Sequence, residues 1–249
     1  MENLGCKLKN YCKQQNCDFR CYPYTILHGV DGKTGLWKTR NVPKRYDNCF
    51  LENLPPIEPS QTRKVITDYI IKVTEAVAQG VGLYLFSVPS KDNPLGTGNG
   101  KTTTAVTILN EFLVKRVITH LQGNEMKSNP VLFMEMADFQ NIYNAQFRGT
   151  KDNQEYASEI FYRYKDRMKK VELLVIDDIA IRNITEAFMN EFYEIINHRV
   201  NEELATIYTS NEPLSGLVEI FGERIVSRIE GSTLQYPFTG KDHRRKEWF

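Results

Sequence analysis

The sequence predicts an α/β fold: a five-stranded parallel sheet flanked by helices, with a ligand site at the carboxyl ends of its strands. Apolar, β-prone runs alternate with segments of helical periodicity from residue 61 onward, as in sheets built from strand–helix–strand units. One of these runs leads into a glycine-rich stretch and a lysine, LYLFSVPSKDNPLGTGNGKTTT at residues 83–104. A strand, such a loop and a following helix together are typical of a cradle for phosphate groups.

The phosphate-binding loop is the best-defined motif. Gly96, Gly98 and Gly100 lack the Cβ atoms that would keep backbone N–H groups away from a polyphosphate. Lys101 can reach the β and γ oxygens, and the hydroxyl of Thr102 is placed for Mg²⁺. The helix after the loop directs the positive end of its dipole at the same anion. The alternative is a glycine-rich connection between strand and helix that binds nothing.

The loop departs from the usual pattern G-x-x-x-x-G-K-[ST] at one position. The pattern places a glycine six residues before the lysine, where this chain has Leu95, and Gly96 follows one residue late. We interpret this difference as a local variation at the entry of the loop.

Length and composition are those of an ordinary globular protein. The 249 residues, 41% hydrophobic and 25% charged, suit one large domain or one domain with an appendage. With a net charge of +1, any DNA site must be a local patch. No apolar run approaches the length of about 18 residues that a membrane span needs, and the N-terminus has no apolar signal region. We therefore expect a cytoplasmic protein without a membrane contact.

Four of the five cysteines lie in one N-terminal segment, CKLKNYCKQQNCDFRC. In a reducing compartment such a cluster more often binds metal than forms disulfides. Four thiolates suit tetrahedral Zn²⁺, which can organise a segment too small to fold on its own core. The predicted zinc ligands are Cys6, Cys12, Cys17 and Cys21. Replacement of one ligand by Cys49 or His28, and thiols without a metal, are the alternatives.

The predicted domain boundary lies close to residue 57. Residues 22–60 are rich in glycine, proline and aromatic side chains, which is typical of an irregular module and a linker. A helical pattern over residues 61–79 then ends at Gly80 and leads into the first strand. We predict a cysteine-rich module over residues 1–57 and a nucleotide-binding domain over residues 58–249.

Two further strands follow the loop. The second is VLFMEM at residues 131–136, and Asp138 is placed to cap the helix after it. The third, VELLVIDD, delivers Asp177 and Asp178 at its carboxyl end, where open α/β sheets bind ligands. The first carboxylate can hold Mg²⁺ beside Thr102, and the second can polarise the water that attacks a γ-phosphate. Many such ATPases have Glu at the second position; Asp is shorter, so we expect slow turnover. A solvated acidic strand end is the alternative.

The fourth strand, LATIYTSN, ends in Asn211. This amide can orient the attacking water and sense the γ-phosphate; a turn-forming asparagine before Glu-Pro would look the same. Before this strand, an amphipathic helix begins at Thr185, and after it come the segment GERIVSRI, a strand TLQYPF and a basic tail. Because only 21 residues follow Arg228, we expect no helical lid over the nucleotide.

In this order, the loop, the acidic strand, TSN and GERIVSRI resemble the AAA+ replicative helicase loaders of the DnaC/DnaI type, especially phage-encoded members, and more distantly the IstB transposition ATPases. The resemblance covers residues 80–245, and its most specific pieces are LLVIDDI, TIYTSN, FGERIVSRI and FTGKDHR. It implies an oligomer of AAA+ domains with ATP at the subunit interfaces, engaging a hexameric helicase and single-stranded DNA.

The resemblance also implies roles for individual residues. The loop that binds ATP corresponds to Gly98, Asn99, Gly100, Lys101, Thr102 and Thr103. Asp177 and Asp178 match the acidic pair, and Asn211 matches the sensor. Arg228 matches an arginine finger, with Arg224, one helical turn earlier, as the second candidate. A solvated helix charge is the alternative for these arginines.

Three functions follow from the sequence. The first is an ATPase that loads a hexameric replicative helicase onto single-stranded DNA at replication initiation, slowly hydrolysing ATP under stimulation by DNA or assembly, with the N-terminal module gripping the helicase. The second is an IstB-like regulator of transposition, and the third is a kinase for nucleotides or small molecules. In loaders, the helix after the second strand lies near the DNA channel. Its aromatic residues Phe139, Tyr143 and Phe147 could stack bases or belong to the core, and Arg148 could meet phosphate.

Overall fold

The computed structural model describes residues 6–8, 11, 21–91, 93–181 and 183–243. Its centre is a five-stranded sheet in the order β2-β3-β4-β1-β5, in which every pair is parallel. The predicted parallel sheet is therefore confirmed. The strands are β1 (Gly82–Ser87), β2 (Val131–Glu135), β3 (Leu173–Asp177), β4 (Thr206–Ser210) and β5 (Thr233–Phe238).

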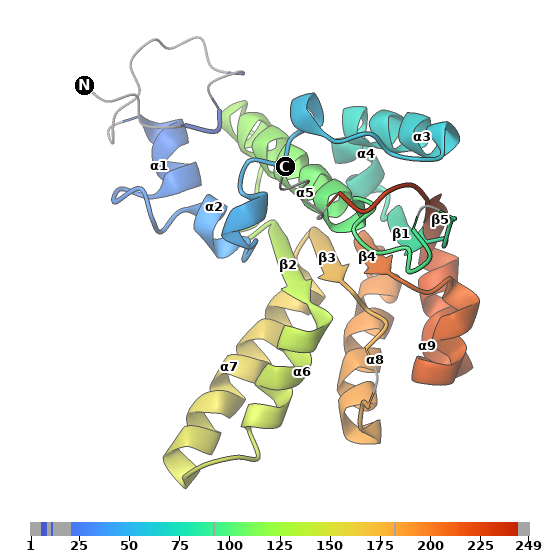
Figure 1. Cartoon of the computed structure of the whole chain (residues 1–249). Coiled ribbons are helices and arrows are strands. Elements are labelled where there is room, and N and C mark those ends of the chain that lie inside the picture. Colours follow the sequence, from blue (N-terminus) through green and yellow to red (C-terminus); the bar gives the residue numbers. More distant parts are fainter. Residues whose placement is uncertain (1–5, 9–10, 12–20, 92, 182, 244–249) are drawn as a thin grey trace, which may run out of the picture.

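Helices cover both faces of the sheet and make three layers (Figure 1). The upper layer in Figure 1 contains α3 (Ser60–Ile71), α4 (Val73–Ala78) and α5 (Lys101–Leu121). The lower layer contains α6 (Met136–Ala145), α7 (Lys151–Lys170), α8 (Glu186–Asn201) and α9 (Val218–Ser232). A 3-10 turn, η3 (Leu214–Leu217), leads into α9.

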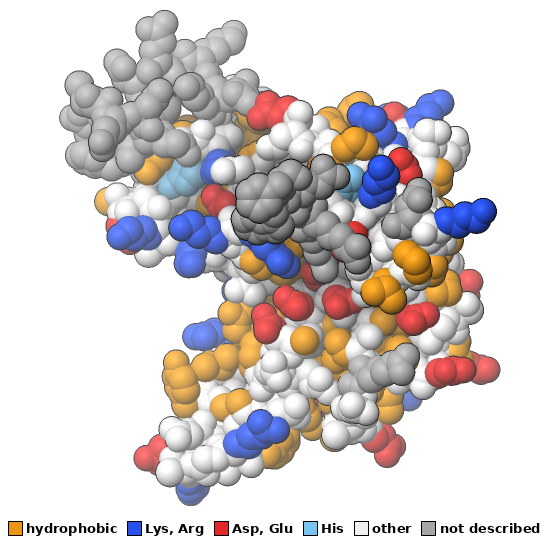
Figure 2. Space-filling model, in the orientation of Figure 1, with side chains coloured by type: hydrophobic (Ala, Val, Ile, Leu, Met, Phe, Trp, Pro, Cys, Tyr) orange, Lys and Arg blue, Asp and Glu red, His pale blue; other side chains and the backbone are white. Residues whose placement is uncertain are grey.

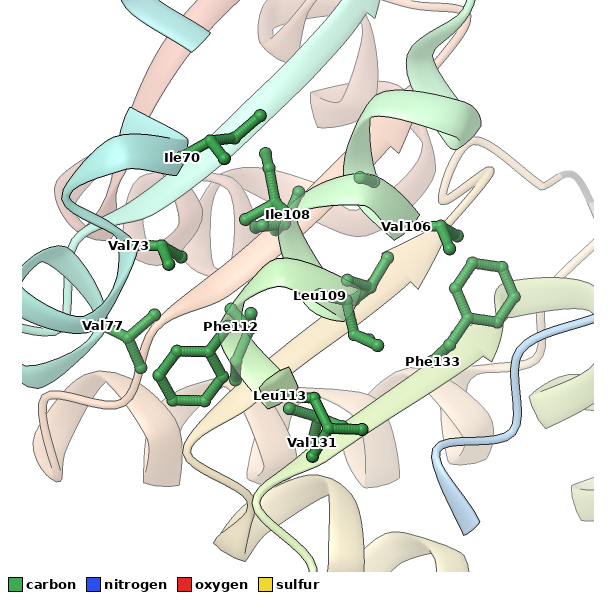
Figure 3. Packing of buried hydrophobic residues seen from close by; sticks show 14 of the residues in the cluster. Ile70, Val73, Val77, Val106, Ile108, Leu109, Phe112, Leu113, Val131 and Phe133 are labelled. Atoms are coloured by element: carbon green, nitrogen blue, oxygen red, sulfur yellow. The ribbon is translucent and has the colours of Figure 1, made fainter. Parts of the chain in front are cut away.

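Each face of the sheet has its own apolar core. Successive side chains of a strand point to opposite faces, so Leu83 and Leu85 pack into the upper core while Tyr84 between them packs into the lower one. Figure 3 shows the upper core, where Phe112 and Leu113 of α5 meet the strands. Burial on both faces explains why the strands are continuous apolar runs rather than alternating ones.

The upper layer extends to the N-terminal segment. It contains α1 (Tyr22–His28), α2 (Leu36–Thr39), η1 (Lys44–Tyr46) and η2 (Leu51–Asn53). Leu27 and Trp37 are buried in the same core as α5. Arg40, only 2% exposed, donates to Asn110 of α5 over 3.1 Å and pairs with Asp47 at 2.6 Å. Residues 21–57 are thus joined to α5 by apolar and polar contacts, and the boundary near residue 57 stays a prediction.

Two local predictions differ from the structure. The helical pattern over residues 61–79 forms two helices, α3 and α4, because Lys72 between them leaves the helical conformation. Asp138 does not cap the helix after β2. That strand runs into α6 without a connecting loop, so Glu135 takes the N-cap position and Asp138 lies in the first turn.

Within the described residues, no helix is long and apolar enough to cross a membrane.

Candidate nucleotide-binding site

The loop between β1 and α5 forms an open cradle at the carboxyl edge of the sheet. Gly98 and Gly100 have φ angles of +70° and +96°, in the left-handed region that glycine adopts without strain. A Cβ built on Gly100 would meet no atom within 4 Å, so the space in front of the first turn of α5 is open. Backbone N–H groups at a helix start in such a turn bind anions.

The displaced glycine at the loop entry has a structural reason. Gly96 has a φ angle of +62°, and a Cβ there would lie 2.9 Å from the Cβ of Ser87. The hydroxyl of Ser87 donates to the Gly96 carbonyl over 2.5 Å. The glycine is therefore needed where the loop folds back onto the end of β1. Leu95, one residue earlier, is 73% exposed and carries no such constraint.

Lys101 is enclosed by the loop rather than exposed. Its side chain is buried, and its ammonium donates to the Ser87 hydroxyl and, over 3.1 Å each, to the side-chain oxygens of Asn99 and Asn211. Lys101 is buried because polar side chains from β1, the loop and the end of β4 converge on it. These hydrogen bonds hold the ammonium at the cradle, and a phosphate must replace some of them.

Asn99 and Thr103 lie at the phosphate loop in different ways. The Asn99 side chain is buried and donates to the Phe238 carbonyl over 2.9 Å, so it braces the loop against the end of β5. Thr103 lies in the first turn of α5 and lines the cavity at the loop. Asn99 therefore shapes the cradle through its side chain, while its backbone stays part of the turn.

Asp177 faces the phosphate loop from the end of β3. It is 6% exposed; its carboxylate accepts hydrogen bonds from the Thr102 hydroxyl over 3.1 Å and from the Thr209 hydroxyl over 2.6 Å. Burial, the main cause, raises the pKa of Asp177. A hydroxyl and a carboxylate in contact are oxygen ligands that suit Mg²⁺, so these two residues fit the metal that accompanies a nucleoside triphosphate.

Asp178, the second acid, lies outside the sheet and is exposed. Its backbone has a φ angle of +52°, which turns the chain away from β3. The Asn211 amide donates to its carboxylate over 3.2 Å, while the oxygen of the same amide accepts from Lys101. Lys101, Asn211 and Asp178 therefore form a continuous hydrogen-bonded row along the strand ends.

Thr209 was not identified from the sequence. Its hydroxyl donates to Asp177 and accepts from the backbone N–H of Asp178 over 2.9 Å, so it fixes both acids. The signal was present in TIYTSN, two residues before Asn211, but strand pairing between β3 and β4 is needed to place it. It is a positioning residue for the acidic pair.

Acidic side chains gather around this edge of the sheet. Figure 2 shows them at the centre of the face, where Figure 1 places the ends of β2, β3 and β4. Burial, helped by the neighbouring Asp138, Asp177 and Asp178, raises the pKa of Glu135 at the end of β2. A divalent cation would relieve this repulsion.

A cavity of about 300 Å³ adjoins the cradle. Residues 98–103 form one side of it, and the other side comes from segments far away in sequence: Arg45, Tyr46, Cys49, Pro55 and His243. The backbone N–H of His243 donates to the Gly98 carbonyl over 3.0 Å, so residues near the C-terminus rest on the loop. Motif reasoning could not find these wall residues, because tertiary packing alone brings them here.

The predicted finger residues lie on α9. Arg224 is exposed and Arg228 is half-buried, one turn apart after a kink at Gly222. Neither lines the cavity at the loop. The structure therefore places Lys101, Thr102, Asp177, Asp178 and Asn211 together, and puts both arginines elsewhere in the subunit.

The zinc prediction falls partly outside the described residues, which exclude Cys12 and Cys17. Among those that the structure describes, no group of three or more His, Cys, Asp or Glu side chains gathers as a metal site would require. His28 accepts a hydrogen bond at Nε2 from the Lys7 backbone, and burial, followed by the charge of Lys7, lowers its pKa to about 4. Cys49 lines the cavity beside the glycine-rich loop. Zinc binding by the cysteine cluster stays a prediction.

The aromatic residues after the second strand divide between core and surface. Phe139 and Tyr143 are buried in the lower core, as the alternative to DNA contact requires. Phe147, 66% exposed, and Arg148, also exposed, lie beyond the end of α6. In Figure 1 the helices α6 and α7 extend well below the sheet and meet at this tip.

No protein-family model matches the sequence, and no curated protein matches it. Solved structures do match. A crystal structure of the DnaC helicase loader aligns at a TM-score of 0.55 with 21% identity, covering 79% of this chain and 99% of that chain. The crystal structure of DnaI aligns at a TM-score of 0.57 with 21% identity, covering 82% of this chain and 95% of that chain. The replication initiator DnaA bound to AMPPCP and single-stranded DNA aligns at a TM-score of 0.53 with 21% identity, covering 80% of this chain and 51% of that chain. At this identity the likeness shows the fold alone, an α/β fold with a parallel sheet flanked by helices, as expected from the sequence.

Proposed function

We propose that this protein is an AAA+ ATPase that loads a hexameric replicative helicase onto single-stranded DNA at replication initiation. The ATPase part rests on one observation above all: Lys101, Asn211 and Asp178 are hydrogen-bonded in a row beside the Thr102–Asp177 contact. The loader part rests on the likeness to the DnaC and DnaI structures, which extends over nearly the whole of those chains.

The residues of the cradle have distinct tasks in ATP hydrolysis. Gly98 allows the left-handed turn of the loop, Gly100 leaves room for the phosphates, and Lys101 exchanges its internal acceptors for phosphate oxygens. Thr102 and Asp177 would hold Mg²⁺, which neutralises charge on the phosphates when bound. All of these groups come from the carboxyl edge of the sheet, where a doubly wound fold binds its ligands.

Asp178 and Asn211 would position and activate the water that attacks the γ-phosphate. Asp178 projects from the strand end toward solvent, and Asn211 connects it to Lys101. A phosphate that draws Lys101 away frees the amide of Asn211 to orient a water toward Asp178. The short reach of aspartate makes the chemical step slow until assembly or DNA improves its geometry.

The finger would act between subunits. Because Arg224 and Arg228 do not line their own cavity, either would complete the site of a neighbour in a homo-oligomer. ATP would then lie at each interface and hold the assembly together on DNA.

Single-stranded DNA is assigned to the tip of α6 and α7. Phe147 can stack on bases, and Arg148 can meet phosphate. We expect Arg148→Ala to weaken binding of an oligonucleotide in low salt. Lys151→Ala is the matched control, because that lysine is already paired with Glu155 at 3.8 Å. Equal losses in both variants would remove Arg148 from the DNA site.

The N-terminal module is assigned to the helicase, with zinc held by Cys6, Cys12, Cys17 and Cys21. Metal analysis under reducing conditions should find about one zinc per chain. Cys17→Ser should release it and weaken helicase binding while ATP binding persists. Protein without zinc that still binds the helicase would refute this assignment.

The experiment that tests the function combines the full chain with a purified hexameric replicative helicase, ATP and circular single-stranded DNA. Because a circle has no end to thread, helicase recovered on it must have been loaded. We expect loading with the native chain and none with Lys101→Ala. Absence of a helicase complex, together with binding to a transposase on duplex DNA, would favour the IstB-like alternative. ATP-dependent phosphorylation of a nucleotide or small molecule would favour the kinase.

A further inference from the structure

The two arginines of α9 meet on one aromatic ring of the neighbouring helix. The guanidinium carbon of Arg224 lies 3.9 Å from the ring centroid of Tyr193 on α8, and that of Arg228 lies 4.8 Å from it. Both distances are well within the range of a cation–π contact. Tyr193 is therefore the shared support of both finger candidates.

Asn197, one turn after Tyr193 on α8, completes the support. Its side-chain oxygen accepts from Nε of Arg228 over 2.8 Å and from the Tyr193 hydroxyl over 3.3 Å. Arg228 also donates through one terminal nitrogen to the backbone carbonyl of Arg224 over 3.2 Å. The guanidinium is held along one edge and over one face, which leaves the second terminal nitrogen for another acceptor.

Cations of this chain contact either carboxylates or, like Lys115 and Arg167, neutral carbonyl groups. Lys165 contacts the carboxylates of Glu191 and Glu194, and Arg116 pairs with Glu172 at 2.7 Å. Within the part of the chain that the structure describes, neither Arg224 nor Arg228 forms an ion pair. Their contacts are with an aromatic face, an amide oxygen and a carbonyl, all of them neutral.

We infer that Tyr193, assisted by Asn197, is a positioning residue that holds the arginine finger ready for the phosphate of a neighbouring subunit. This inference rests on the proposed function, because it needs an ATP site completed in trans. Like charges one turn apart on a helix repel each other, and the π face of Tyr193 offsets that repulsion for both arginines. A carboxylate would offset it too, but would compete with the phosphate for the guanidinium.

The support should therefore affect turnover more than ATP binding. A finger without its support samples many rotamers and reaches the phosphate in few of them. Because the site of its own subunit is untouched, ATP affinity should stay unchanged. A role in packing alone would instead appear as lower thermal stability, with turnover unchanged below the melting transition.

The test measures ATP turnover, ATP affinity and Tm for variants of the full chain. Tyr193→Leu keeps an apolar side chain without the ring and should lower kcat about tenfold, the size of effect that a lost cation–π contact gives. Tyr193→Phe keeps the ring and should retain most of the activity. Tyr162→Leu, which removes an exposed tyrosine on α7, is the matched control and should have no effect. Asn197→Asp should lower kcat while raising Tm, because it gives Arg228 a charged partner.

Mixing experiments separate this inference from the finger itself. Tyr193→Leu mixed with Lys101→Ala should regain turnover, because the second parent supplies a supported finger to the intact loop of the first. Tyr193→Leu mixed with Arg228→Ala should not. If Arg228→Ala hydrolyses ATP normally, the proposed finger is wrong. If Arg228→Ala is inactive while Tyr193→Leu equals the native chain, the finger stands and the positioning role is overturned.

Discussion

Both layers of helices bury charged side chains, Arg40 in the upper layer and Arg199 in the lower one, but they differ in the side chains that have a proposed function. In the upper layer, Arg40 and Asn110 are buried and bonded to other parts of the same chain, and Lys101 is drawn into its own loop. In the lower layer, Arg148, Arg224 and Phe147 face outward. In the proposed function, the upper half holds a nucleotide within the subunit, and the outward-facing side chains of the lower half act on neighbouring subunits and DNA.

The largest expected effect is the loss of ATP binding when Lys101 of the upper half is removed. Lys101→Ala should abolish ATP binding in a direct titration, because the cradle loses the ammonium that meets the β and γ oxygens in the proposed arrangement. The protein should still unfold cooperatively. Lys91→Ala, which removes an exposed lysine of the same loop, is the control and should bind ATP normally. Unchanged affinity in Lys101→Ala would show that the nucleotide lies elsewhere.

A second change tests whether the N-terminal segment belongs energetically to the upper half. Arg40→Met should lower the free energy of unfolding by about 2 kcal/mol, because the buried guanidinium loses its bonds to Asn110 and to the partly exposed Asp47. The guanidinium also stacks on Trp37, with its carbon 3.9 Å from the ring centroid. Lys38→Met removes an exposed cation of α2, two residues before Arg40, and should cost nothing measurable. Equal denaturation midpoints for the two variants would mean that the Arg40 contacts do not anchor the segment.

A smaller expected effect is the pH dependence of stability caused by Asp177 at the carboxyl edge of the sheet. Because burial raises the pKa of Asp177, its folded form binds the proton more tightly than the unfolded chain does. Stability is therefore lost as the pH rises from the ordinary value of 3.8 through the raised pKa, and stays lost above it.

Asp177→Asn removes this loss. Without nucleotide or Mg²⁺ at neutral pH it should raise the free energy of unfolding by about 1 kcal/mol, and the gain should vanish in acid. With Mg-ATP present the native chain should become the more stable one. Asp178→Asn, at an exposed carboxylate, should leave the free energy of unfolding unchanged across pH, both without ligand and with Mg-ATP. Denaturant titrations across pH measure this, and a gain that persists in acid would show that the buried charge of Asp177 is not its cause.

The sequence predicted those features that depend on the residue pattern of a single strand or loop. The apolar runs predicted the parallel sheet, and the rule that such sheets bind ligands at the carboxyl ends of their strands predicted that Asp177 would lie beside Thr102. Sequence reasoning failed where the partner is distant. Thr209 fixes the acids only through pairing of β3 with β4, and Tyr193 meets Arg228 only through packing of α8 on α9. The burial of Lys101 likewise depends on three separate segments.

The central claim is that the two halves cooperate between subunits, with the loop of one chain completed by Arg228 of the next. Arg228→Ala should bind ATP nearly normally and hydrolyse it about 10³-fold more slowly, at the lower end of the range for arginine fingers. The direct test mixes this variant with Lys101→Ala, since one parent keeps the loop and the other keeps the finger. We predict turnover well above that of either parent once the two proteins co-assemble. A co-assembled mixture as inactive as its parents would contradict the claim.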